Sequence, residues 1–185
     1  MHVGARFAIA MGAVALAASA QTPQKIIADK STLRFVTRQM NVPVEGQFRT
    51  FDATVAFDPA KPAATKAQFE VDLGSIDLGN AEGETEAKRK AWLDVAGFPK
   101  AKFVASAVKQ TGPGKYEASG ALTIKGATQT LVAPFTLAES GALRMVDGQF
   151  TLKRLQFKIG EGVWSDIDTV ADDVIVKFHF TIPVH

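Results

Sequence analysis

Apolar and polar residues alternate along most of this 185-residue chain, and this period of two constrains the fold more than any other feature. Alternation places the apolar side chains on one face of an extended strand, which is typical of a half-buried β-strand. The longest apolar sets are Ala67, Phe69, Val71 and Leu73; Ala118, Gly120, Leu122 and Ile124; Leu131, Ala133, Phe135 and Leu137; and Val174, Val176, Phe178, Phe180 and Ile182. The pattern therefore predicts an all-β protein.

Turn signals separate the alternating runs. They are Asp58-Pro59, Gly112-Pro113-Gly114, Lys125-Gly126, Ser140-Gly141 and Asp147-Gly148. Short strands at this spacing favour an antiparallel barrel or sandwich over a βαβ fold, and we expect a barrel of about eight strands. The length and the absence of repeats or long linkers predict a single domain over residues 21–185. The chain has no cysteine, so disulfides cannot stabilise it and the barrel needs a substantial core.

Residues 1–20 have the form of a secretory signal peptide. Arg6 precedes an apolar run that ends in Ala18-Ser19-Ala20, a small-residue cleavage pattern. The run is shorter than the about 20 residues that a membrane-spanning helix needs, so a membrane anchor or an amphipathic helix fits it less well. We expect cleavage after Ala20, export of the protein, and no transmembrane span.

Residues 80–98 interrupt the alternation with a helical pattern. Glu84 and Lys88 are four residues apart and favour a helix, which Gly97 and Pro99 end. The apolar residues near its end are Trp92, Leu93 and Phe98. Two interpretations stay open: a short helical lid across one end of the barrel, or a surface helix docked by Trp92.

Phenylalanine is unusually frequent, with 13 Phe against two Trp and one Tyr. If each strand turns its apolar face inward, the interior combines large rings with very small residues. The rings are Phe35, Phe48, Phe57, Phe69, Phe103, Phe135, Phe150, Phe178 and Phe180, and the small residues are Gly46, Ala53, Ala67, Ala105, Ala107, Ala118, Gly120, Ala133 and Gly148. Because native interiors are close-packed, the small residues leave either a cavity suited to a hydrocarbon or sheets that approach closely around a self-filled core.

Arg154 shares the parity of Phe150 and Leu152 and so points inward at a strand end, unless a β-bulge turns it to solvent. A buried guanidinium needs a partner for its charge. The expected partner is a carboxylate in a salt bridge, with Asp166 or Asp94 as candidates.

The sequence contains no arrangement of residues typical of catalysis. Its three histidines are isolated, and neither a G-x-S-x-G turn nor an H-E-x-x-H motif is present. The acidic stretch 166–173 lacks the central Gly and terminal Glu of a calcium loop. The run Lys88-Arg89-Lys90 is short, and the net charge is only +2. We therefore expect no enzymatic activity, no cofactor, no metal and no nucleic-acid partner.

An ordered series of segments from about residue 28 to residue 182 resembles the YceI-like family of bacterial periplasmic proteins. The segments include Asp29-Lys30-Ser31-Thr32-Leu33-Arg34-Phe35, Val44-Glu45-Gly46-Gln47-Phe48, Phe57-Asp58-Pro59, Val71-Asp72-Leu73-Gly74-Ser75-Ile76-Asp77, Trp92-Leu93-Asp94, Phe98-Pro99-Lys100-Ala101-Lys102-Phe103, Gly120-Ala121-Leu122-Thr123-Ile124-Lys125-Gly126, Gly148-Gln149-Phe150-Thr151-Leu152-Lys153-Arg154, Gly160-Glu161-Gly162-Val163-Trp164 and Val170-Ala171-Asp172-Asp173-Val174. Each segment is a weak signal alone, but their order and spacing together are specific.

The resemblance implies a lipocalin-like antiparallel barrel whose apolar tunnel binds a polyisoprenoid or another long amphiphile. It implies a non-enzymatic lipid carrier of the periplasm, and a protein that can form a homodimer. We expect the ligand-lining residues to be Phe35, Phe48, Trp92, Leu93, Phe98, Phe103, Leu122, Phe135, Phe150, Leu152 and Phe178. The alternative is an envelope protein that binds a protein partner and whose barrel core is filled by its own side chains.

Overall fold

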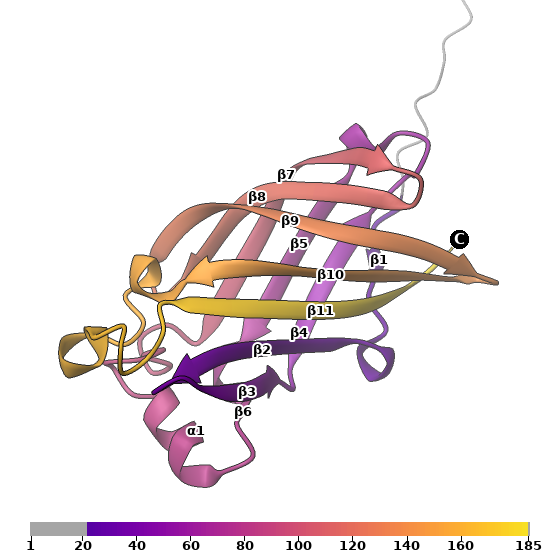
Figure 1. The fold of residues 1–185 in the computed structure, drawn as a ribbon. Helices are drawn as coiled ribbons and strands as arrows, with labels where there is room; N and C mark the ends of the chain where they lie inside the picture. The colour runs from indigo at the N-terminus through magenta and orange to yellow at the C-terminus, as the bar shows by residue number, and fades with distance from the viewer. Residues whose placement is uncertain (1–21, 185) are drawn as a thin grey trace, which may run out of the picture.

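The computed structural model describes residues 22–184 as one antiparallel sheet of eleven strands (Figure 1). The strands are β1 (Gln24–Lys25), β2 (Thr32–Gln39), β3 (Val42–Phe48), β4 (Phe51–Ala56), β5 (Lys66–Asp72), β6 (Ile76–Asp77), β7 (Lys100–Gly112), β8 (Lys115–Ile124), β9 (Ala127–Ser140), β10 (Leu143–Lys153) and β11 (Asp173–Pro183). The helices are α1 (Ala81–Ala87) and the 3-10 turns η1 (Ala28–Lys30), η2 (Pro62–Ala64), η3 (Leu73–Ser75), η4 (Arg154–Phe157) and η5 (Gly162–Ser165). The predicted signal peptide, residues 1–20, lies outside the described residues.

The sheet curls on itself into a barrel. Its strand order is β1-β4-β5-β7-β8-β9-β10-β11-β2-β3-β6, and Figure 1 shows β4 and β5 behind the layer formed by β10, β11 and β2. The backbone N–H of Ile27, just after β1, donates to the carbonyl of Thr181 in β11 at 2.8 Å and ties the two layers together. The predicted all-β antiparallel barrel is confirmed.

The structure has eleven strands where the sequence predicted about eight. β1 and β6 are two residues each, too short to show an alternation. The expected turn at Asp147-Gly148 is wrong, since both residues lie inside β10 and pair with His179 and Phe178 of β11. Gly148 leaves room there for the ring of Phe178 and does not turn the chain.

A β-bulge in β7 corrects the predicted inward face of that strand. The register between β7 and β8 shifts between Ala105 and Ala107. One extra residue reverses the parity of the strand, so Val108 is buried while Ala107 is exposed. The prediction that Ala107 faces the interior is therefore wrong, and nothing in the local sequence signals the bulge.

The helix α1 is much shorter than the predicted segment 80–98. Asn80 begins it, because its side-chain oxygen accepts a hydrogen bond from the backbone N–H of Gly83 at 2.7 Å. It stops at Ala87, whose carbonyl accepts from the N–H of Leu93 as the chain folds back into turns. These turns deliver Trp92 and Leu93 to the barrel end below β2 and β3, where Figure 1 shows α1.

Two buried clusters form the core. One gathers around Phe57, Tyr116 and Phe180, and the other around Leu73 and Phe157. In the first cluster the opposite walls of the barrel meet. The ring of Phe180 in β11 stacks on Phe69 of β5 with centroids 5.0 Å apart, and lies 5.9 Å from the ring of Phe51 in β4. This packing brings the two layers of the barrel together, and we call this part of the barrel the Phe180 end.

Candidate functional site

The barrel encloses an apolar cavity of about 500 Å³. Every strand except β1 contributes to its lining, as do α1 and the loop between β10 and β11. This volume lies within the range of about 300–1,000 Å³ that is usual for ligand pockets. The interior therefore has room for a ligand, and it is not filled by the protein's own side chains.

Phenylalanine rings fill the space that the interior glycines were expected to leave. Each ring comes from a neighbouring strand and lies over its glycine, so that a Cβ atom there would overlap the ring. The pairs are Phe35 with Gly46, Phe103 with Gly120, and Phe178 with Gly148. This arrangement is known from sheets in which an aromatic residue shields a glycine on the next strand. At these glycines the alternative of close packing applies, since the rings leave no free volume there.

Alanines, in contrast, do face the open volume. Ala67 of β5, Ala105 of β7, Ala118 of β8 and Ala133 of β9 all line the cavity. They lie on four different strands. At each position the side chain is a methyl group, whereas a leucine would extend into the cavity. The small side chains of these alanines therefore leave the cavity open, and phenylalanine rings form much of its wall.

Ten of the eleven predicted ligand-lining residues line the cavity. They are Phe35, Phe48, Trp92, Leu93, Phe103, Leu122, Phe135, Phe150, Leu152 and Phe178. The exception is Phe98, which is 39% exposed and lies against Gly126 in the turn between β8 and β9. Phe98 packs on the outside of the barrel because it precedes β7 and its ring covers that turn. Phe98 is therefore not part of the cavity lining.

Charged side chains along the cavity wall point away from it. Asp52, Glu70 and Lys102 lie next to each other across β4, β5 and β7, on the outward parity of their strands. Asp52 pairs outside the barrel with Lys25 at 3.0 Å, and Glu70 pairs with Lys100 at 3.2 Å. Hydrogen bonds from these lysines hold the pKa values of Asp52 and Glu70 below their ordinary range. The interior is left to apolar side chains.

The cavity reaches the surface at the end opposite the Phe180 end. Gln39 of β2, Glu86 of α1 and Trp164 of the β10–β11 loop line it there, and none of the three is buried. Trp164 packs against Trp92 with ring centroids 5.4 Å apart. We call this opening the mouth. The segment 80–98 combines features of both interpretations: α1 lines the cavity at this barrel end, and Trp92 docks the segment against Trp164.

A single buried arginine holds the loop that borders the mouth. Arg154 is 1% exposed, and all five of its N–H donors are used by backbone carbonyls. The acceptors, at 2.7–3.1 Å, are the carbonyls of Ile159, Gly160, Trp164, Val170 and Ala171. The predicted salt bridge to Asp166 or Asp94 is wrong, because carbonyls of one loop occupy every donor. Desolvation by burial lowers the pKa of Arg154, and the nearby Asp172 opposes this shift.

A second buried cation ties the same loop to the barrel. Lys125, in the turn between β8 and β9, donates to the carbonyl of Lys158 at 2.7 Å and to the carboxylate of Glu161 at 2.8 Å. The hydrogen bond from Lys125 holds the pKa of Glu161 below its ordinary value. Sequence reasoning missed the hydrogen bonds of Lys125, since they join residues 33 and 36 positions apart along the chain. The glycines Gly160 and Gly162, both at positive φ, are the only local signal of the loop.

Within residues 22–184, no three His, Cys, Asp or Glu side chains are grouped so that they could bind a metal ion. No helix in that part of the chain has both the length and the apolar character to cross a bilayer. His179 lies on the outward parity of β11, where its Nδ1 contacts Asp147 at 2.7 Å, away from the cavity.

Comparison with protein families finds that residues 25–182 match the YceI-like domain. A UPF0312 protein of Pseudomonas savastanoi pv. phaseolicola is 39% identical over 98 residues, which is 53% of this chain and 51% of that protein. A UPF0312 protein of Yersinia pestis is 35% identical over 96 residues, 52% of this chain and 50% of the relative. The matched segment spans about half the length of these curated relatives.

Among solved structures, BcnA of Burkholderia cenocepacia superposes with a TM-score of 0.82 at 43% identity, covering 84% of this chain and 98% of BcnA. A polyisoprenoid binding domain from Saccharophagus degradans, implicated in plant cell wall breakdown, superposes with a TM-score of 0.71 at 15% identity. The match covers 88% of this chain and 98% of that domain. At this identity the second likeness is one of fold.

Proposed function

The chain belongs to the YceI-like family, and from this premise we propose that it binds a polyisoprenoid or a similar long-chain amphiphile inside its barrel. The observation that carries the proposal is the cavity of about 500 Å³, lined by phenylalanine, alanine and aliphatic side chains. The polyisoprenoid binding domain of the same fold supports the ligand class. Burial of apolar surface is worth about 25 cal/mol per Å², so a long prenyl chain can bind tightly without a polar anchor.

We further propose that the protein is a carrier or a sequestering protein of the periplasm. The sequence of residues 1–20 supports export. A polyprenyl chain is insoluble in an aqueous compartment, so a protein that moves or stores it there must cover the chain. A barrel whose apolar cavity opens at the mouth suits this task. It needs no chemical step, in keeping with the proposal that the protein is not an enzyme.

The competing hypothesis is an interaction module with a self-filled core. Such a core would place large side chains where Ala67, Ala105, Ala118 and Ala133 stand. The open cavity favours the binding of a ligand over this alternative. Association into a homodimer stays a prediction.

Native mass spectrometry tests the proposed function. The protein is expressed with its full chain in a bacterial host, purified without detergent and measured under native and denaturing conditions. We expect the native mass to exceed the polypeptide mass by one lipid, and the organic extract to contain a prenyl compound. A native mass equal to the polypeptide mass, together with no uptake of added octaprenol, would contradict the proposal.

A further inference from the structure

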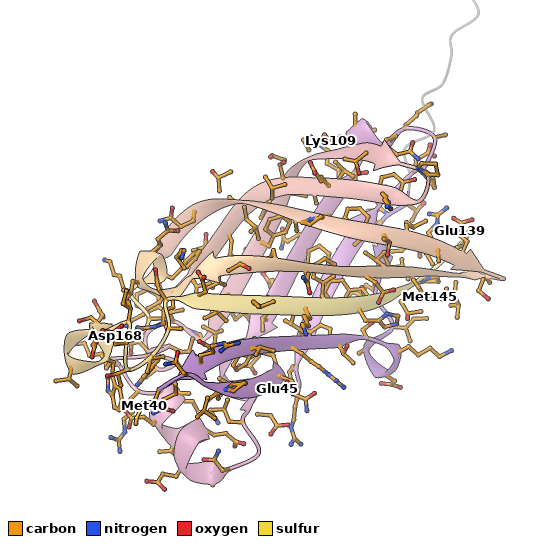
Figure 2. The ribbon with its side chains drawn as sticks, viewed as in Figure 1. Met40, Glu45, Lys109, Glu139, Met145 and Asp168 are labelled. Atoms are coloured by element: carbon orange, nitrogen blue, oxygen red, sulfur yellow. The ribbon has the colours of Figure 1, made fainter. Side chains whose placement is uncertain are left out.

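The four most exposed large apolar side chains of the described residues lie at one end of the barrel. They are Met40, Val42, Val163 and Ile167, which are 58–85% exposed, whereas the other exposed large apolar residues reach at most 49%. Met40 and Val42 belong to the hairpin between β2 and β3, and Val163 and Ile167 to the loop between β10 and β11. Figure 2 shows the labelled Met40 and Asp168 at this end. We call these four side chains the rim.

Backbone hydrogen bonds join the two segments that bear the rim. The N–H of Met40 donates to the carbonyl of Thr169 at 2.8 Å, and the N–H of Ala171 donates to the carbonyl of Arg38 at 2.9 Å. Gln39 and Val170 form a β-bridge between these two bonds. The exposed side chains are therefore held on one connected structure, which Arg154 fixes from inside through the carbonyls of the loop.

The same two segments border the mouth of the cavity. Gln39 in the strand before the hairpin, and Trp164 and Val170 in the loop, line the cavity within four residues of the rim side chains. The charged side chains that line the cavity are engaged elsewhere. Arg154 donates to carbonyls and Glu86 pairs with Arg89, while Asp52, Glu70 and Lys102 lie on the outward parity of their strands. An amphiphile therefore enters with its hydrocarbon tail first and leaves its polar head at the mouth.

We propose that the rim docks on the surface of a lipid bilayer, so that a prenyl chain passes from the membrane into the cavity without crossing water. This inference rests on the proposed function, because it takes the ligand to be a membrane-soluble chain. Exposed apolar side chains that border a cavity mouth fit insertion at the headgroup level. Exposed charges of both signs, Arg38, Asp166 and Asp168, lie within two residues of a rim residue along the chain.

Transfer from vesicles tests this role of the rim. Phosphatidylcholine vesicles containing octaprenol are mixed with the full-length protein, and the initial rate of octaprenol appearance in the protein fraction is measured. The rim variant is Val163→Asp with Ile167→Asp, and the matched control is Val132→Asp, whose side chain is exposed on the barrel wall in β9. Binding of octaprenol presented in detergent is measured for all three proteins.

We expect the rim variant to transfer octaprenol at least tenfold more slowly than the wild type, since two apolar contacts with the bilayer are lost. Its binding of detergent-presented octaprenol stays within twofold of the wild type, and the control changes neither quantity. Equal transfer rates, or equal slowing by the control, would overturn the inference while leaving the proposed function intact. The inference would also be overturned if the wild type were a dimer and the rim variant a monomer, because the rim would then contact a second copy of the chain. Failure of the wild type to bind octaprenol in detergent would overturn the proposed function itself.

Discussion

Arg154 is the side chain that holds the loop beside the mouth, through five hydrogen bonds. Its guanidinium donates to five carbonyls of a loop that crosses the barrel end. Replacement by methionine preserves much of the bulk and removes every donor. We expect Arg154→Met to lower the free energy of unfolding by about 3–5 kcal/mol, because each carbonyl left buried without a donor costs about 1–3 kcal/mol.

Denaturant unfolding measures this effect, with Arg34→Met as the control. Arg34 is exposed on the outer face of β2, where a substitution changes stability by about 0.5 kcal/mol or less. A loss below about 1 kcal/mol for Arg154→Met would mean that the loop carbonyls find other donors, and that the loop does not depend on Arg154.

Gly148 tests the pairing of rings with glycines. A Cβ atom at this position would overlap the ring of Phe178 and the carbonyl oxygen of Pro134. We expect Gly148→Ala to destabilise the protein by about 1–3 kcal/mol through overpacking, measured by thermal or denaturant unfolding. Gly112→Ala is the control, since its nearest contact would be the Cβ of Lys115 at 3.9 Å. A neutral Gly148→Ala variant would show that the ring of Phe178 moves aside at no cost.

Among the elements, the loop between β10 and β11 is held by an ion pair whose contribution to stability depends on pH. The hydrogen bond from Lys125 lowers the pKa of Glu161, so the folded state holds the proton of Glu161 less tightly than the unfolded state does. Its contribution is present above the ordinary glutamate pKa and is lost as the pH falls through the lowered pKa of the folded protein. We expect the unfolding temperature to fall over that acidic range, and Glu161→Gln to reduce the pH dependence. An unchanged pH profile in the variant would contradict this account.

The elements also show how far the sequence alone can lead. The strands β2 to β5 and β7 to β11 follow from alternation, because burial of one face is a local property of the chain. The bulge at Ala105 and the short strands β1 and β6 leave no such signal. Likewise, the covering of Gly46 by Phe35 depends on the register between two strands, and the carbonyls around Arg154 depend on the path of a loop. The alternation of apolar residues thus identified most of the cavity lining. It did not distinguish the glycines, which are covered by rings, from the alanines, which face open volume.

At the scale of the whole molecule, binding of a prenyl chain requires that the cavity be open volume and not a packed core. Ala105 and Ala107 offer a matched pair on either side of the bulge in β7. Ala105 lines the cavity, whereas Ala107 is exposed outside the barrel. Gly120, directly across from Ala105 on β8, is unsuitable for the same test, because a side chain there would overlap the carbonyl oxygen of Val104.

The most direct test is therefore octaprenol binding by the wild type, Ala105→Leu and Ala107→Leu, with the stability of each protein measured alongside. The account predicts that the wild type and Ala107→Leu bind one octaprenol per protein molecule. It predicts that Ala105→Leu binds at least tenfold more weakly, because the leucine occupies the space of the chain, and that it loses less than about 1 kcal/mol of stability. A loss of about 3 kcal/mol in Ala105→Leu, or wild-type binding by that variant, would contradict an open cavity that holds the ligand.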